Sequence, residues 1–196
     1  MKIKKKWNTG NKKWPKKCQM DNGIILKIPQ QKNFGSFCRR HGCSVAAVSI
    51  ALQIFGIKMS PYAVYKWCKE NLPGNSGSKV AIKGTEVAIN GILKEHGIER
   101  GAYWKAIDGK NTVKAIRDCL KKNGVVLIEC DNPIHTNCLI ATRQGGIWNA
   151  SNGKFIKTTA TKMVKKALKG SKKRKDQTNW FKGRTGDSGI VCVYPR

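Results

Sequence analysis

Acidic residues are scarce in this chain of 196 residues, which has 11 Asp and Glu against 39 Lys and Arg and a formal net charge of +28. A charge of that sign and size predicts attraction to polyanions, such as nucleic acid, an acidic wall polymer or an anionic membrane surface. Most of the charge comes from lysine, which lacks the fixed bidentate geometry of arginine. The composition therefore indicates a class of partner without choosing one.

Long apolar runs are also missing. No stretch has the length of a membrane span, and the basic start, MKIKKKWNTGNKKWPKKCQM, is not followed by the apolar run of a signal peptide. We therefore expect a cytoplasmic protein, with non-classical export left open. Hydrophobic residues still make up 40% of the chain, enough for a core. Residues 1–20 are expected to form a basic arm, and residues 21–196 a single domain.

The chain has eight cysteines but no Cys-x-x-Cys pair, which argues against zinc and thioredoxin-like sites. A disulfide scaffold is not expected either, because the chain is large, rich in apolar residues and without an export signal. We predict no metal and no cofactor.

The first half of the sequence has helical patterns. The segment SVAAVSIALQIF is apolar nearly all round, which predicts a buried helix that ends at Gly56. Ser60, Thr85 and Asn111 are expected to cap three further helices, and Pro61 strengthens the first of these. The four expected helices span 44–55, 60–72, 85–97 and 111–124.

The period then changes to that of strands. Strands are expected at 125–130, 135–142, 146–150 and 189–194, with a short one earlier at 23–28. A lysine-rich helix at 161–170 and a basic loop at 170–187 precede the last strand. Helices followed by an antiparallel sheet, with no internal repeat, predict an α+β fold.

Cys43 stands immediately before the buried helix. Its sulfur would lie near unpaired backbone N–H groups and the positive end of the helix dipole, which favours the thiolate over the thiol. A thiolate is both a nucleophile and a metal ligand, and an inert buried thiol is the plainer alternative. Position alone does not choose among the three.

A nucleophilic cysteine needs a base, and the chain has only three histidines. His96 falls in the last turn of a helix, where a ring nitrogen most simply bonds the C-terminal carbonyls. His41 lies in a loop only two residues before Cys43. His135 begins a strand, and the following hairpin brings Asn149 back toward it, so that an Asn could orient the base. Asn149 also belongs to NASNG, a good turn sequence.

Two other interpretations of FCRRHGC remain open. Cys38, His41 and Cys43 could bind a metal, although three ligands within six residues without a second pair make a poor zinc pattern. Cys38 and Cys43 could also form a redox pair.

The order of cysteine, buried helix, further helices, strand, histidine strand, hairpin and Asn resembles the papain-like cysteine peptidases. It is similar above all to the double-glycine leader peptidases that process bacteriocins, and to their broader bacterial relatives. The residues that carry the likeness are Cys43, Gly56 thirteen residues later, and GVVLIEC…HTNCLIATRQGGIWNASNGK. The likeness covers about 24–160 and the peptidase domain alone.

The resemblance implies a papain-like fold and a catalytic triad. Cys43 would be the nucleophile, His135 the base and Asn149 the orienting residue. Gln31, or its neighbour Gln30, would supply a side-chain donor to the oxyanion hole. Cys38 and His41 would then be residues of the entry loop.

We therefore expect a cysteine peptidase, a hydrolase that cleaves peptide or other amide bonds. Two alternatives remain: a wall amidase or acyl transferase with the same triad, and a non-catalytic polyanion-binding protein with a papain-like shell. A peptide or protein substrate is the expected partner. A polyanion is a further candidate, bound through the basic arm at 1–20 and the loop at 170–187.

Overall fold

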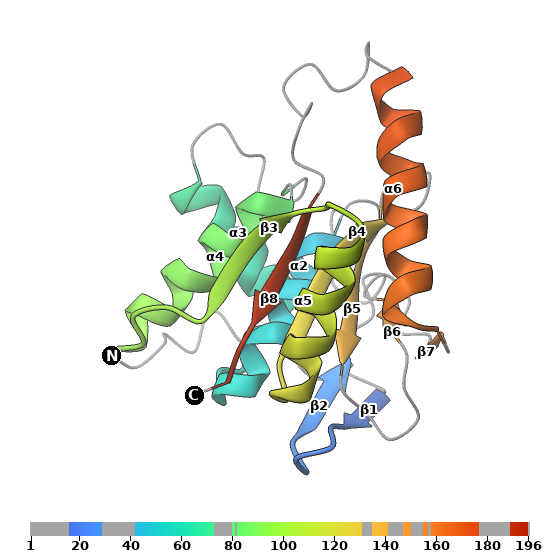
Figure 1. Ribbon diagram of the computed structural model, residues 1–196. Coiled ribbons are helices and arrows are strands. Elements are labelled where there is room, and N and C mark those ends of the chain that lie inside the picture. Colours follow the sequence, from blue (N-terminus) through green and yellow to red (C-terminus); the bar gives the residue numbers. More distant parts are fainter. Residues whose placement is uncertain are drawn as a thin grey trace.

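The structure is a computed structural model, and its central element is a six-stranded antiparallel sheet (Figure 1). The strand order is β3 (Ala102–Ala106), β8 (Gly189–Val193), β4 (Val125–Cys130), β5 (His135–Ile140), β6 (Ile147–Asn149) and β7 (Phe155–Ile156). The residues that the structure describes are 16–28, 42–72, 80, 82–130, 135–140, 147–149, 155–156, 158–176 and 189–195. For 16–19, 130, 135, 147–149, 155–156 and 170–176 the description covers the backbone alone.

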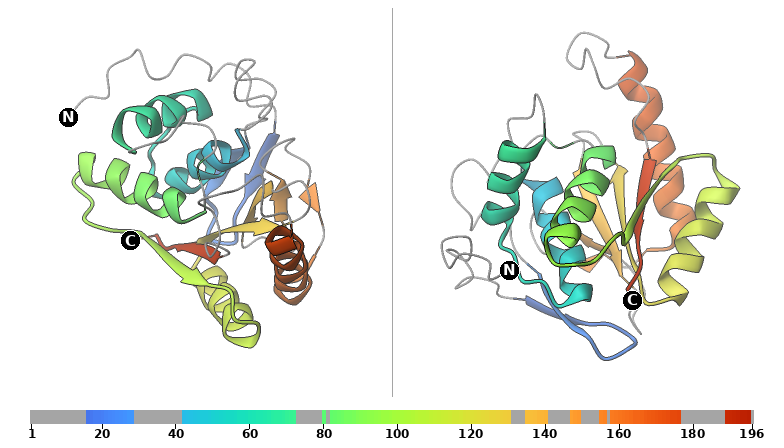
Figure 2. Two further views of the ribbon diagram at one scale, coloured as in Figure 1. Left: turned by 90° about the horizontal axis from the view of Figure 1, so that it is seen from above. Right: turned by 90° about the vertical axis from the view of Figure 1, so that its left-hand side faces the viewer.

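Helices cover both faces of this sheet. On one face lie α2 (Cys43–Leu52), α3 (Pro61–Asn71) and α4 (Ile82–Glu95), and on the other α5 (Lys110–Lys121) and α6 (Ala160–Asp176) (Figure 2). Successive side chains of β4 point to opposite faces of the sheet and so contribute to two hydrophobic clusters. Leu127 packs against the α2–α4 side, and Val126 and Ile128 pack against the α5–α6 side. The expected mixture of helices with an antiparallel sheet is confirmed.

Helix α2 is the most buried of the helices on its face. Nine of its ten residues are buried, as its nearly uniform apolar sequence predicts. A 3-10 turn, η4 (Gln53–Phe55), follows it, and Gly56 ends the segment with φ of 75°. Glycine adopts this left-handed conformation more readily than any other residue. The predicted end of the helical segment at Gly56 is confirmed.

Of the three predicted helix caps, one is confirmed and two are wrong. Ser60 does cap α3, because its Oγ accepts the Ala63 N–H at 3.1 Å. Thr85 does not cap α4, which begins at Ile82, and its hydroxyl donates to the Ile82 carbonyl. The helix starts earlier because Ile82 is itself packed in the core. Asn111 is likewise inside α5, which begins at Lys110.

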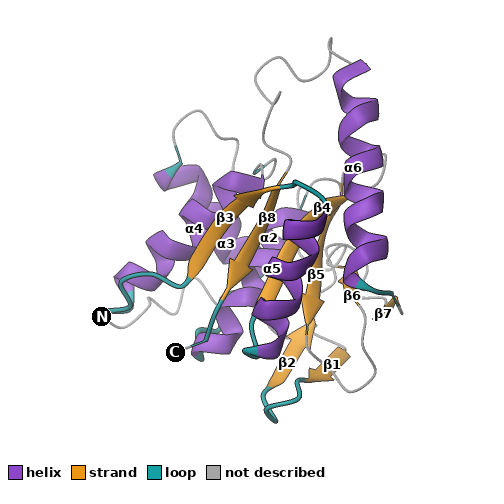
Figure 3. Cartoon of the chain, in the orientation of Figure 1, coloured by secondary structure: helices purple, strands orange, loops and turns teal. Residues whose placement is uncertain are grey.

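Two stretches expected to be irregular contain regular structure. The end of the basic arm forms β1 (Lys16–Gln19), which pairs with β2 (Ile25–Ile28) in a hairpin separate from the main sheet (Figure 3). The Gln53 amide holds β2 in place: it accepts the Lys27 N–H and donates to the Lys27 carbonyl, both at 2.8 Å. Residues 1–15 lie outside the described residues.

Helix α6 also runs past its expected end. It continues to Asp176, so the first part of the predicted loop at 170–187 is helical. Lysine and arginine are good helix formers, which lets the helix pass through Gly170. Residues 177–188 are not among those that the structure describes. In the described part of the chain, no helix combines the length and apolarity needed to cross a membrane.

Candidate active site

Cys43 is the first residue of α2 and is partly exposed. Among the described residues no side chain caps this helix, and its first turn holds no acidic residue. The first intrahelical bond runs from the Ala46 N–H to the Gly42 carbonyl, so the earlier N–H groups of α2 have no acceptor within the helix. The start of α2 is therefore a favourable place for a negative charge.

The start of α2 meets the start of β5. The Ser44 and Thr136 hydroxyls are joined by a buried hydrogen bond of 3.0 Å across 92 residues of sequence. One turn further along α2, the Cys138 thiol donates to the Ala47 carbonyl at 3.8 Å. The two contacts hold the first turns of α2 against β5.

The register of the hairpin relates the other two predicted triad residues. Asn149 pairs with Asn137 across β5 and β6, and His135 lies two residues before Asn137. His135 and Asn149 therefore occupy diagonal positions on the same face of the sheet, a separation of about 7–8 Å between such neighbours. The hairpin thus brings Asn149 back toward the start of the His135 strand.

The two faces of β5 have different neighbours. Thr136 and Cys138 contact α2, whereas Leu139 packs into the cluster formed with α5 and α6. Strict alternation assigns position 135 to the face of Leu139, away from α2. A contact between Cys43 and His135 therefore requires the first residue of β5 to depart from that alternation. The structure brings the two chain positions together but does not describe a contact between their side chains.

The remaining residues singled out in the sequence divide into two groups. Gln30, Gln31, Cys38 and His41 lie outside the described residues, so the oxyanion donor, the entry loop and the metal alternative stay predictions. His96 is described, and its Nδ1 lies 2.8 Å from the Ile92 carbonyl in the last turn of α4. Its predicted structural role is confirmed.

The other four free cysteines with described side chains are buried. Burial raises the pKa of Cys68 to about 12. Burial also raises the pKa of Cys138, and the nearby Cys43 adds to the rise. The Cys68 and Cys138 thiols therefore stay protonated and are poor nucleophiles. Cys138 falls in the strand predicted at 135–142, but its position beside α2 depends on a contact that no local pattern signals.

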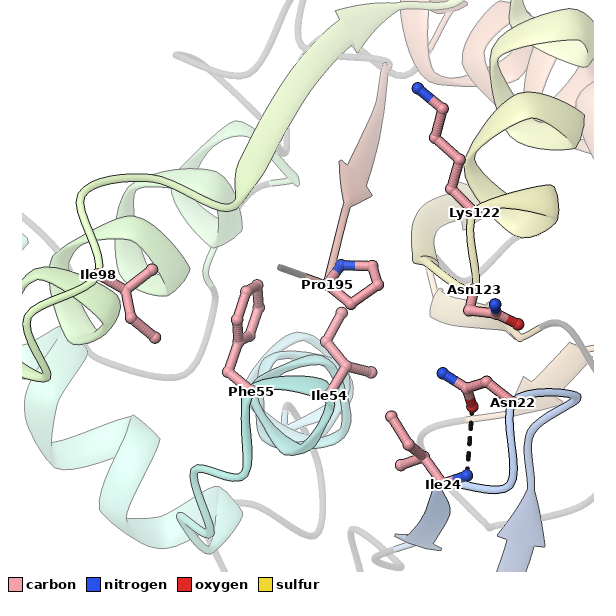
Figure 4. A pocket seen from close by; sticks show the side chains of 8 residues that line it. All are labelled: Asn22, Ile24, Ile54, Phe55, Ile98, Lys122, Asn123 and Pro195. Atoms are coloured by element: carbon pink, nitrogen blue, oxygen red, sulfur yellow. Dashed lines mark hydrogen bonds between the residues drawn. The ribbon is translucent and has the colours of Figure 1, made fainter.

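A pocket of about 470 Å³ lies at the other end of α2 (Figure 4). Its lining residues are Asn22, Ile24, Ile54, Phe55, Ile98, Lys122, Asn123 and Pro195. Ile54 and Phe55 belong to η4, which follows the C-terminal end of the helix. The pocket is therefore separate from Cys43, and its lining supplies no cysteine or histidine.

Comparison of the chain with family models gives no match, and comparison with curated proteins gives none either. The case for a site at Cys43 therefore comes from the residues and their geometry, and the papain-like fold stays a prediction.

Proposed function

We propose that the chain is a thiol-dependent hydrolase of peptide or other amide bonds, with Cys43 as its nucleophile and a papain-like arrangement of the site. The observation that carries the proposal is the position of Cys43 on the uncapped N-terminus of a buried helix. It is the one partly exposed thiol among the five free cysteines with described side chains. Nucleophilic cysteines need both access and a positive electrostatic environment.

In the proposed reaction the Cys43 thiolate attacks the amide carbonyl carbon, and the carbonyl oxygen becomes an oxyanion. The Cys43 backbone N–H at the start of α2 and the Gln31 amide donate hydrogen bonds to it. Loss of one such donor typically costs on the order of 10²–10³ in rate. The C–N bond then breaks and the amine leaves with a proton from His135. Water, deprotonated by the same histidine, hydrolyses the thioester and frees Cys43.

His135 and Asn149 serve as base and orienting residue in this proposal. Their diagonal positions on β5 and β6, on the face away from α2, suit a hydrogen bond between the two side chains that would fix one ring nitrogen. The proposal requires the His135 ring to reach the α2 side from the end of its strand. The register pairs His135 with Cys130 without a bulge, so the ring would have to reach Cys43 around the end of β5, of which His135 is the first residue.

Labelling with iodoacetamide, followed by mass spectrometry of the peptides, tests the nucleophile. In the folded protein Cys43 should react fastest, and Cys43→Ala should lose that label. Cys68→Ala is the matched control, because its thiol is buried, and should label as the parent does. Rapid labelling of Cys38 that persists in Cys43→Ala would move the nucleophile to Cys38.

Turnover of a library of fluorogenic peptides tests the other roles. Cys43→Ala should abolish turnover, and His135→Ala should lower kcat by about 10²–10⁴, the usual contribution of a general base. Full turnover in His135→Ala would refute the base while leaving the nucleophile in place. Release of products only when an amine acceptor is added would indicate acyl transfer instead of hydrolysis.

A further inference from the structure

The charges of the described residues are distributed unequally over the two faces of the molecule. In the described residues of 42–72, 80 and 82–101, on the side of α2–α4, six basic residues stand against four acidic ones, a net charge of +2. Along 107–122 and 158–169, on the side of α5 and α6, nine basic residues stand against two acidic ones, a net charge of +7. Among the helices that the structure describes, the excess positive charge therefore gathers on the α5–α6 side.

We call these nine basic residues, which belong to α5, to its C-terminal cap Lys122 and to α6, the basic face. They are Lys110, Lys114, Arg117, Lys121, Lys122, Lys162, Lys165, Lys166 and Lys169, and all are exposed. We infer that the basic face binds the phosphate backbone of double-stranded nucleic acid without reading its sequence. This role is independent of the proposed chemistry at Cys43.

The basic face is built on a rigid support. Ile116 of α5 and Met163, Val164 and Ala167 of α6 share one buried cluster against the sheet. The two helices lie next to each other on that side in both views of Figure 2. Because their apolar residues point into the core, the basic residues between them in sequence point to solvent. The charges are therefore presented together on a fixed surface.

The acidic residues of this side neutralise little of the charge. Asp118 pairs with Lys114 at 2.9 Å, and the hydrogen bond from Lys114 lowers the pKa of Asp118, with the charges of Lys121 and Lys122 adding to the effect. Asp108 binds the start of α5 through Thr112 and Asn111 instead of a basic residue. The two acidic residues leave this side with a net charge of +7, which attracts anions from solution.

The shape and chemistry of the basic face favour duplex nucleic acid over a membrane. A helix that lies on a membrane needs a free apolar side, and that side of α6 is occupied by the core. Leu168, 41% exposed, is the one large apolar residue that the described part of α6 exposes. A duplex offers one phosphate charge per ~1.7 Å, and the 17 residues of α6 rise by about 25 Å along such a charge array.

The predicted mode of contact is independent of base sequence. Eight of the nine residues are lysines, which act as point charges and do not form the planar fork that reads base edges. Phosphate contacts of this kind position a protein on a duplex without specifying a site. By sequence, the last turns of α6 add KKRK at 172–175, in the direction in which the helix projects past the sheet (Figure 1).

Fluorescence anisotropy with a labelled DNA duplex of mixed sequence tests the inference on the full chain. The test variant is the triple substitution Lys162→Gln, Lys165→Gln and Lys169→Gln. It should weaken binding on the order of 10²-fold at ~0.1 M salt, and should lower the slope of log K against log salt by about 0.9 for each phosphate that the variant no longer neutralises. Circular dichroism and unfolding curves establish that the variant is folded.

The matched control removes the same charge from the other face, by Lys58→Gln, Lys69→Gln and Lys94→Gln, all exposed positions. It should change affinity less than threefold, and Cys43→Ala should not change it at all. Equal losses in both triple variants would show that net charge alone attracts DNA and would overturn the inference. Unchanged binding by the α6 variant would overturn it too, as would binding to anionic phosphatidylserine vesicles without binding to DNA.

Discussion

Two buried hydroxyls, those of Ser44 and Thr136, join the start of α2 to the start of β5. Ser44→Ala leaves the Thr136 hydroxyl in the core without this partner, which should cost about 1–3 kcal/mol in the free energy of unfolding. Thr136→Val should cost a similar amount. The double variant removes both polar groups together, so its loss should be smaller than the sum of the two single losses.

Urea unfolding of the four proteins measures this coupling. A double variant whose loss equals the sum would show that the hydrogen bond does not stabilise the fold. Peptide turnover in Ser44→Ala adds a readout of position, because a shifted α2 would move Cys43 relative to the substrate.

For individual residues, the sequence predicts the position of Cys43 but not the residues that lie around it. A cysteine directly before an apolar run predicts a thiol at the start of a buried helix, and the structure confirms that placement. The Ser44–Thr136 contact spans 92 residues and could not be predicted, because no local pattern pairs one small hydroxyl with another. The side on which position 135 falls depends on the register of the whole sheet.

Among the elements, α5 has a start that depends on a carboxylate. Asp108 Oδ1 accepts the Thr112 N–H, and Asp108 Oδ2 accepts from the Asn111 amide, both at 2.9 Å. The bond from the Asn111 side chain, with those from Thr112, lowers the Asp108 pKa from its ordinary value of 3.8. A carboxyl whose pKa is lower in the folded state stabilises the fold above its ordinary pKa, and this contribution is lost as the pH falls through the folded value.

The free energy of unfolding should therefore fall more steeply with acid in the parent protein than in Asp108→Asn. Asparagine keeps an acceptor for the Thr112 N–H but does not titrate. The difference between the two proteins should be constant near neutral pH, shrink below pH 3.8 and disappear once Asp108 is protonated. Urea unfolding at pH values from ~2 to ~6 measures it, and a difference that grows in acid would contradict the assignment.

Elements with a strong pattern were predicted well, and those fixed by tertiary contacts were not. Helix α3, with Ser60 and Pro61 at its start, and strand β4 were predicted from sequence. Strand β3 was not, because most of its residues are exposed and its pairing with β8 lies far along the chain. Nor could a sequence pattern assign α5 to the face opposite α2, since the amphipathic period is the same for either side.

For the whole molecule, the net charge was known from composition, but its placement was not. The sequence directed polyanion binding to the arm at 1–20 and the loop at 170–187, because charge runs are visible there. The basic face joins helices about 50 residues apart, so it emerges only after both pack on one side of the sheet. Patches built by topology in this way are not visible in sequence windows.

A surface that gathers like charges should reduce the stability of the protein that carries it. The triple substitution of Lys162, Lys165 and Lys169 by Gln relieves repulsion on the basic face, and Lys and Gln have similar helix propensities. It should therefore raise the free energy of unfolding at ~20 mM NaCl. Lys162 also lies in the first turn of α6, where a cation opposes the helix dipole, so its removal acts in the same direction.

The control triple at Lys58, Lys69 and Lys94 should not stabilise. Lys69 and Lys94 lie in the last turns of α3 and α4, where cations are favourable, and acidic residues share that face. In ~1 M NaCl the Debye length is ~3 Å, so the free energy of unfolding of each triple variant should be nearly equal to that of the parent protein. Urea unfolding at the two salt concentrations measures this. If the α6 variant alone gains stability and loses DNA binding, the basic face lowers the stability of the protein and serves to bind DNA. If the α6 variant loses stability at low salt, its lysines do not repel one another enough to destabilise the fold, which would contradict the prediction.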